Sequence, residues 1–192
     1  MARATVIIPT HDHADTLLRS IPTAQRQTLR DIEILVVGDG VPDRTREIMA
    51  GFVRDDPRVR FLDNPKAPRN GEVHRAAVLR EAHGRIVCYL SDDDLWLPDH
   101  VECLERVLSE ADFAHSLHVQ ADPSGRLWPI LFDLGVPLYR EGLQQRDQNG
   151  FGLSFGGHRM DAYRRLPEGW RTTPGELPTD LFMWQQFLAQ DW

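Results

Sequence analysis

The chain has few of the features that mark nucleic-acid-binding, secreted or membrane-spanning proteins. Its 22 lysines and arginines are outnumbered by 29 aspartates and glutamates, and the net charge of −7 argues against a nucleic-acid-binding surface, which is normally basic. With only Cys88 and Cys103 present, we expect reduced core cysteines and no disulfide framework. No apolar run approaches the length of a membrane span, and no signal-peptide hydrophobic region follows Met1. The sequence therefore predicts a cytoplasmic protein without a transmembrane segment.

What is present is typical of one α/β domain. The 192 residues, of which 41% are hydrophobic and 27% charged, suit a single domain over residues 1–192 with a sizeable core. Ala4 to Ile8 and Ile32 to Val37 are continuous, largely β-branched runs, as expected for parallel strands buried on both faces.

Amphipathic stretches alternate with these strands through the first half of the chain. The predicted strands cover 4–8, 32–37, 59–62 and 86–90. The predicted helices are one with Leu17, Leu18 and Ile21 on its apolar side and an expected kink at Pro22, then 43–52, 72–82, and 99–110 with Val101, Leu104, Val107 and Leu108 on one side. This alternation predicts an α/β fold with a mostly parallel central sheet flanked by helices.

The second half of the chain is less regular. Residues 144–157 are polar and contain glycine, which is typical of a mobile loop, and residues 167–178 are also predicted as loop. The remaining predicted elements are strands over 114–120 and 127–131, the turn at 122–125 between them, and an apolar helix opened by Asp180.

Three consecutive carboxylates, those of Asp92, Asp93 and Asp94, follow the predicted strand at 86–90. Adjacent acids repel one another, so folding alone does not favour them at the end of a buried strand. A divalent cation bound together with a phosphate group removes this conflict, since hard oxygen ligands suit Mg²⁺ or Mn²⁺. A solvated acidic turn that caps the next helix is the alternative.

Other polar residues also come directly after predicted strands. Thr10 to Asp12 follow the first strand, and Asp39 follows the second. In parallel α/β sheets, ligands bind beyond the carboxyl ends of the strands. These residues should therefore gather with the three acids along one edge, which favours the metal-site interpretation.

The order and spacing of several motifs resemble the inverting GT-A glycosyltransferases of family 2. The resemblance covers about Arg3 to Leu188, and its marks are Val6-Ile7-Ile8-Pro9-Thr10, Gln27-Thr28, Glu33 to Gly40, Ala82-His83-Gly84 and Ser91 to Pro98. It implies a GT-A fold, with residues 1–111 as the nucleotide-binding half and residues 112–192 as the half that carries acceptor contacts and the catalytic base.

The resemblance also implies a nucleotide site. Pro9, Thr10 and His11 lie in the loop that touches the nucleotide, with His11 at a position where the family often has an aromatic residue. Asp39 matches the carboxylate that hydrogen-bonds the base, usually uracil or thymine. Arg75 fits a basic position of the family and is expected either to contact the diphosphate or to lie on a solvated helix face.

Further residues match the family's metal and catalytic positions. Asp92 and Asp93 correspond to the DXD motif, with Asp92 nearer the ribose and Asp93 as the ligand of Mn²⁺ or Mg²⁺, while Asp94 either contacts the donor or caps the next helix. Asp180 matches the catalytic base, which takes the proton of the acceptor hydroxyl, and it also suits a helix N-cap; the two roles can coexist. His158 is a weaker candidate for diphosphate or metal contact, because a lone histidine is more often structural.

Some positions depart from the family pattern. Gly38-Asp39-Gly40-Val41 stands where Asp-Asp-Gly-Ser is usual, and Ala76 replaces an asparagine. The chain ends at Trp192, soon after the expected base helix, so further metal ligands or acceptor contacts are either absent or belong to a longer protein. These departures motivate an alternative, a catalytically silent nucleotide-sugar-binding domain or fragment, whereas the retention of Asp93 and Asp180 favours an enzyme.

Three other motifs point to different functions. Gly152 to Gly156 satisfies the G-x-S-x-G pattern of a hydrolase nucleophile elbow, but the expected preceding strand and the order of Asp and His are missing. Gly38-Asp39-Gly40 lacks the third glycine of a dinucleotide fingerprint. His11-Asp12-His13 resembles a metal-binding fragment, and without a helix that places both histidines on one face we favour a loop over a zinc site.

The motifs together predict a metal-dependent inverting glycosyltransferase. It would move a sugar from a UDP- or dTDP-linked donor to the hydroxyl of a saccharide, lipid-linked or other acceptor. A nucleotidyltransferase, which forms diphosphate from a nucleoside triphosphate, is a more distant alternative. The sequence does not name the sugar, the acceptor or the oligomeric state.

Overall fold

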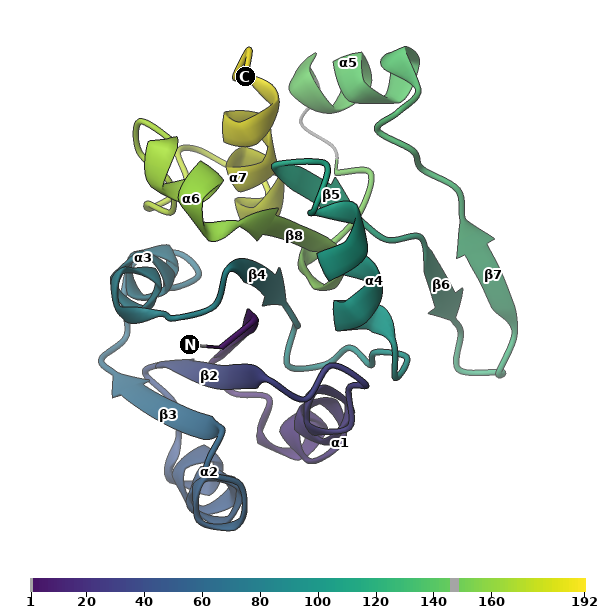
Figure 1. The fold of residues 1–192 in the computed structure, drawn as a ribbon. Coiled ribbons are helices and arrows are strands. Elements are labelled where there is room, and N and C mark those ends of the chain that lie inside the picture. Colours follow the sequence, from purple (N-terminus) through teal and green to yellow (C-terminus); the bar gives the residue numbers. More distant parts are fainter. Residues whose placement is uncertain (1, 146–148) are drawn as a thin grey trace.

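The structure is a computed structural model that describes residues 2–145 and 149–192. Within this part, six strands form one sheet in the order β3-β2-β1-β4-β8-β5 (Figure 1). The strands are β1 (Ala4–Thr10), β2 (Ile32–Asp39), β3 (Val59–Asn64), β4 (Ile86–Tyr89), β5 (Phe113–His115) and β8 (Gly156–Arg159). Strands β1 to β4 are mutually parallel, and β8 pairs antiparallel with both β4 and β5. The predicted mostly parallel sheet is confirmed.

Helices cover both faces of this sheet (Figure 1). They are α1 (Ala14–Gln25), α2 (Asp43–Asp55), α3 (Glu72–Glu81), α4 (His100–Val107), α5 (Pro137–Gln145), α6 (Met160–Arg165), α7 (Thr179–Leu188) and the 3-10 turn η1 (Leu153–Phe155). Side chains of α1, α2 and α4 pack with Val6 and Ile8 on one face, whereas α3, α5, α6 and α7 pack with Ile7 on the other. Successive side chains of β1 thus enter two different cores, which is why Val6, Ile7 and Ile8 are all apolar.

Two helix residues that were predicted to lie on the apolar, core-facing side are exposed to solvent. Leu18 of α1 is 48% exposed, and Val107 of α4 is 47% exposed. The buried stripe of α1 instead follows Leu17, Ile21 and Ala24, at intervals of four and three residues. Such a stripe is narrow, so an apolar residue next to it can still face solvent.

The second half holds more structure than predicted. The expected strand at 114–120 is two strands, β5 and β6 (His118–Ala121), and β6 pairs with β7 (Leu127–Ile130) in a separate two-stranded sheet. Helices α5 and α6 were not predicted. Residues 167–178 are irregular, as expected.

The prediction of a loop over 144–157 is confirmed for residues 149–152 and wrong for 144–145, which end α5, and for 153–157, while residues 146–148 lie outside the described residues. The segment includes η1 and begins β8, which is inserted between β4 and β5. Its glycines reflect close packing: a Cβ on Gly156 would lie 2.6 Å from the Trp184 ring, and one on Gly157 would lie 3.1 Å from the Val87 carbonyl oxygen. Glycine at positions 156 and 157 leaves space for these neighbouring groups and does not indicate a flexible segment.

The carboxyl ends of β1, β2 and β4 lie at one edge of the sheet, because these strands are parallel neighbours. The chain leaves β1 and β4 toward the same helical face, where α1 and α4 lie. Of the predicted site residues, Thr10 and Asp39 end β1 and β2, and Asp92 to Asp94 lie in the loop after β4. In the described part of the chain, no helix is long and apolar enough to cross a membrane.

Candidate active site

The acidic turn after β4 holds its three carboxylates in different environments. Asp92 is 8% exposed, and its Oδ1 lies 3.1 Å from His13 Nδ1. The hydrogen bond and the charge of Asp92 together raise the pKa of His13. Asp94 accepts a 2.6 Å hydrogen bond from Ser154 Oγ. Asp93 is exposed and makes no hydrogen bond or ion pair with any described residue, so its carboxylate is available to a ligand.

Ser154 anchors this turn. Its side chain is fully buried, and its hydroxyl accepts the Ser91 N–H at 2.8 Å while donating to Asp94. Its carbonyl oxygen accepts the indole N–H of Trp96 at 2.7 Å. Burial raises the pKa of Asp94 despite the Ser154 hydrogen bond, and the neighbouring charge of Asp93 adds to the increase. The serine of the G-x-S-x-G pattern is therefore a structural residue, bonded to a carboxylate rather than to a histidine.

Asp39 is the last residue of β2 and is nearly buried. It is 6% exposed, its Oδ2 lies 2.6 Å from Lys66 Nζ, and its Oδ1 accepts the Ala67 N–H at 2.6 Å. Burial pushes the pKa of Asp39 upward, but the hydrogen bonds from Ala67 and Lys66 outweigh burial and hold it below its usual value. His11 is exposed and its Nδ1 lies 2.6 Å from the Asp39 carbonyl oxygen, so the loop after β1 lies beside Asp39.

Gly71 forms part of the wall beside Asp39. It has φ +68°, and a Cβ there would lie 2.8 Å from Asp39 Cγ. Any larger residue would combine an unfavourable left-handed backbone with a collision at the carboxylate. Its place next to Asp39 carries no local signal in the sequence, because the contact joins residues 32 positions apart.

The departures from the family pattern after β2 belong to one packing unit. A Cβ on Gly38 would lie 3.1 Å from both Phe61 and Val41, and Val41 is 3% exposed. Gly38 and Val41 therefore pack together against Phe61 in a small apolar contact. This contact accounts for both departures and does not involve the Asp39 carboxylate.

Arg75 of α3 is buried, with 5% of its surface exposed, so the solvated-face alternative is wrong. Its Nε and Nη1 have no hydrogen-bond partner among the described residues. The guanidinium lies 4.9 Å from the centre of the Trp170 ring, and burial lowers the pKa of Arg75 against the opposing charges of Glu72 and Asp180. A buried cation with unused donors is costly and is suited to an anion that arrives from solution.

Asp180 is the second residue of α7, and Pro178 occupies the N-cap position, so Asp180 is not the cap. Its Oδ1 accepts the N–H of Leu181 at 2.9 Å. Burial raises the pKa of Asp180, although that hydrogen bond and the charge of Arg75 partly oppose the increase. The carboxylate is thus a stronger proton acceptor than an exposed aspartate.

Glu72 ties the start of α7 to α3. It is fully buried, and its Oε1 accepts hydrogen bonds from Thr179 Oγ1 at 3.0 Å and from the Thr173 N–H at 3.3 Å. Asn70 Nδ2 also donates to Thr179 Oγ1 at 2.8 Å. These contacts place Asp180 beside Arg75. Sequence reasoning missed Glu72, Lys66 and Ser154, since their partners are remote in the chain.

The remaining predicted residues lie at different depths. Pro9 is half-buried and Thr10 is 4% exposed, with an Oγ1 that has no partner in the described part. His158 is fully buried in the core, where its Nε2 accepts the Tyr89 hydroxyl at 2.7 Å, and burial lowers its pKa to about 4. It pairs with Val87 inside the sheet and is not brought together with the other predicted residues.

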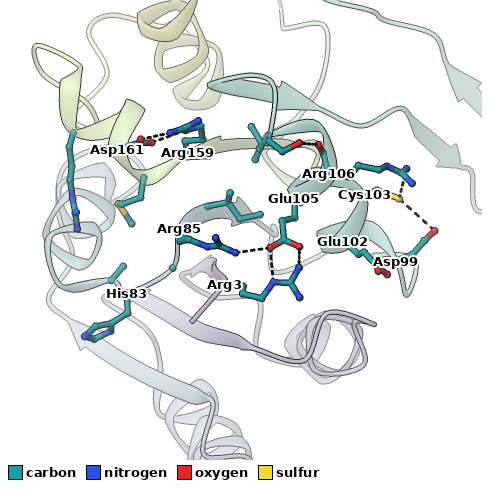
Figure 2. Close-up of a pocket in the computed structure, with 17 residues that line it drawn as sticks. Arg3, His83, Arg85, Asp99, Glu102, Cys103, Glu105, Arg106, Arg159 and Asp161 are labelled. Carbon is teal, nitrogen blue, oxygen red and sulfur yellow. Dashed lines mark hydrogen bonds and ion pairs between the residues drawn. The ribbon is translucent and has the colours of Figure 1, made fainter. Parts of the chain in front are cut away.

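A hollow of about 1140 Å³ lies elsewhere, at the amino ends of β1 and β4 (Figure 2). It contains none of the predicted site residues. Figure 2 shows its arginines turned toward acids: Arg3 and Arg85 toward Glu105, and Arg159 toward Asp161. Because these charges are largely paired and the hollow is at the opposite edge from the strand carboxyl ends, the acidic turn is the better candidate for the active site.

A family model described as glycosyl transferase family 2 matches residues 5–165. The chain belongs to this family. Over 135 residues it is 30% identical to the chondroitin synthase of Pasteurella multocida, an alignment that covers 65% of this chain and 14% of that protein. Over 115 residues it is 29% identical to the GalNAc(5)-diNAcBac-PP-undecaprenol beta-1,3-glucosyltransferase of Campylobacter jejuni, covering 60% and 37%. The chain therefore spans well under half the length of these relatives.

Solved structures confirm the GT-A fold. A mannosyltransferase of Pyrobaculum calidifontis, in complex with GDP-Man and Mn²⁺, superposes with a TM-score of 0.65 at 18% identity over 93% of this chain and 50% of that one. Residues 1–349 of S. aureus TarS, in complex with UDP-GlcNAc, superpose with a TM-score of 0.65 at 14% identity over 97% and 53%. At these sequence identities, the structural similarity supports the fold and says nothing of substrate or activity.

Proposed function

We propose that this family 2 chain is a metal-dependent inverting glycosyltransferase that takes a nucleotide-diphosphate sugar as donor. The observation that carries the proposal is the unpartnered, exposed carboxylate of Asp93 between two engaged ones, Asp92 and Asp94. A turn that served folding alone would engage all three acids or expose all three. Here two are held in place and one is presented to solvent.

The donor set suits Mn²⁺ or Mg²⁺. Within the described residues, no group of three His, Cys, Asp or Glu side chains could hold a metal ion by itself. Mg²⁺-type sites of nucleotide enzymes commonly use one or two carboxylates and complete their coordination with substrate phosphates and water. Asp93 would therefore hold the cation together with the donor. When bound, the cation stabilises the negative charge of the departing nucleoside diphosphate.

The nucleotide would lie along the carboxyl edge, between the β2 and β4 loops. The Asp39 carboxylate, held ionised by its hydrogen bonds, would accept an N–H of the base, and the exposed His11 ring would pack against it. The buried guanidinium of Arg75, with its unpartnered Nε and Nη1, would contact the diphosphate. By family resemblance the base is uracil or thymine, although one structural neighbour is a complex with GDP-Man.

Asp180 would act as the catalytic base. Its carboxylate takes the proton of the acceptor hydroxyl as that oxygen attacks the anomeric carbon, and the bond from this carbon to the diphosphate oxygen breaks. The raised pKa of Asp180 strengthens it as a base. Attack opposite to the leaving group inverts the configuration. The acceptor would be a saccharide or a lipid-linked saccharide, consistent with the names of the relatives.

A turnover assay tests this function. Wild type, Asp180→Asn and the exposed control Asp191→Asn are given UDP-, dTDP- and GDP-sugars with Mn²⁺ and a panel of acceptor saccharides, and release of nucleoside diphosphate is followed. We expect turnover of one donor class by wild type and by the control, and a loss of about 10²- to 10⁴-fold in Asp180→Asn with donor affinity retained. Normal turnover by Asp180→Asn would show that another group is the base.

A further inference from the structure

The two-stranded sheet of β6 and β7 extends away from the main sheet as a ribbon (Figure 1). Its cross-strand pairs run from His118–Ile130 through Val119–Pro129 and Gln120–Trp128 to Ala121–Leu127. Side chains of paired residues point to the same face, and the faces alternate along each strand. The register therefore divides the ribbon into two faces of different chemistry.

One face is turned toward the body of the molecule and the active site. His118 stacks on Phe155 with ring centroids 4.2 Å apart, and its neighbour Ile130 is half-buried. Further along this face, the Trp128 indole N–H donates to Gln120 Oε1 at 3.1 Å. This side of the ribbon already has partners in the described part of the chain.

The opposite face is apolar throughout and exposed; we call it the apolar ribbon face. Val119, Ala121, Leu127 and Pro129 form it, and Leu117 and Leu131 continue its alternation at the ends of the strands. Leu117, Val119, Leu127 and Leu131 are 60%, 59%, 69% and 70% exposed. Six apolar residues alternating with other residues are the pattern of a sheet face that is covered.

Two physical arguments require a cover for this face. An isolated two-stranded ribbon is marginally stable in water and gains most of its stability from packing. The exposed apolar area of the six residues is roughly 500 Å², toward the upper end of the largest apolar patch on a typical soluble monomer, and patches of this size are often functional. Two such faces together would bury about 1,000 Å², the lower limit of a specific interface.

The charges of the ribbon indicate which kind of partner covers the apolar ribbon face. Residues 118–130 contain one acid and one arginine, Asp122 and Arg126, and these form an ion pair at 2.7 Å. An anionic membrane surface would need unpaired basic residues beside the apolar ones. An acceptor at the active site would meet the His118 face, which is the other side of the ribbon. In a chain of net charge −7, a neutral apolar face is where two copies can approach with least repulsion.

From these observations we infer that the apolar ribbon face is a self-association surface, on which the same face of a second copy of this chain packs. The same patch then serves both copies, as in a closed two-fold dimer, and contact stops at two chains. The active sites lie on the other side of each ribbon and remain open. The inference is independent of the proposed transferase activity.

Sedimentation equilibrium of the 192-residue chain tests this inference, with Val119→Glu as the variant and Val53→Glu as the control. Val53 is 41% exposed on α2, so both changes add one charge in place of an exposed valine. Wild type and Val53→Glu should form a dimer of twice the 22.0 kDa chain mass at micromolar concentration. Val119→Glu should weaken dimerisation at least about 100-fold, because a charge would be buried in an apolar contact.

A second measurement guards against a misfolded variant. In the wild type, hydrogen exchange of the amides of 117–131 should slow as protein concentration rises, while exchange in α2 should not change. A wild-type chain that stays monomeric at about 100 μM would overturn the inference, which predicts a dimer at micromolar concentration. A dimer that Val119→Glu leaves intact, or ribbon exchange independent of concentration, would also overturn it.

Discussion

Ser154→Ala should both destabilise the fold and disorganise the acidic turn. The substitution removes two hydrogen bonds from a fully buried hydroxyl, one accepted from the Ser91 N–H at 2.8 Å and one donated to Asp94 at 2.6 Å. A buried donor left without a partner costs about 1–3 kcal/mol, and a hydrogen bond to a charged group contributes about 1.5–3 kcal/mol. Since water reaches part of this turn, we expect the free energy of unfolding to fall by about 2–4 kcal/mol.

Urea denaturation measures this loss, with Ser109→Ala as the control. Ser109 Oγ donates to the Arg106 carbonyl oxygen at an exposed position, so its removal should change the free energy of unfolding by less than about 0.5 kcal/mol. The same Ser154→Ala protein should bind Mn²⁺ with nucleotide more weakly, because the backbone that presents Asp93 is no longer fixed. A Ser154→Ala chain as stable as wild type, with unchanged metal-dependent binding, would refute the anchoring role of Ser154.

Two further predictions concern the surroundings of Asp39 and the pH dependence of the free energy of unfolding. Gly71→Ala should cost more stability and nucleotide affinity than Gly125→Ala in calorimetric titration and denaturation, because both have positive φ but only a Cβ at 71 would collide with Asp39; equal effects would contradict this. The pKa of His158 and that of His100 are each lowered by burial to about 4. In the unfolded chain these histidines are protonated as the pH falls below about 6.5, whereas in the folded chain they stay neutral down to about pH 4. The free energy of unfolding should therefore fall by about 1.4 kcal/mol per histidine for each unit by which the pH is lowered from 6.5 to 4. His158→Gln should reduce that slope in urea denaturation, and an unchanged slope would show that His158 does not cause it.

Much of the fold could be predicted because its signals are local. The run from Val6 to Ile8 is apolar at three successive positions, which is typical of a strand buried on both faces. Parallel strands have their carboxyl ends at one edge, and so the gathering of Asp39 with Asp92 and Asp93 followed from strand order alone.

What could not be predicted depends on contacts between remote segments. The β8 strand begins with two glycines, which have low strand propensity, and their reason is the Trp184 ring and the β4 backbone. The sequence argued against Ser154 as a nucleophile but could not predict its structural role, which depends on its bonds to Ser91 and Asp94. Amphipathic periodicity also could not say that Leu18 lies outside the packed stripe.

The account depends most on a metal-dependent nucleotide site at the turn after β4. Isothermal titration of UDP, dTDP and GDP, each with Mn²⁺ and with chelator, tests it on wild type, Asp93→Asn and the exposed control Asp99→Asn. We predict binding of one nucleotide that needs Mn²⁺, persists in Asp99→Asn and is lost in Asp93→Asn. Binding that is indifferent to the metal and to Asp93, or no binding of any of the three, would contradict the account.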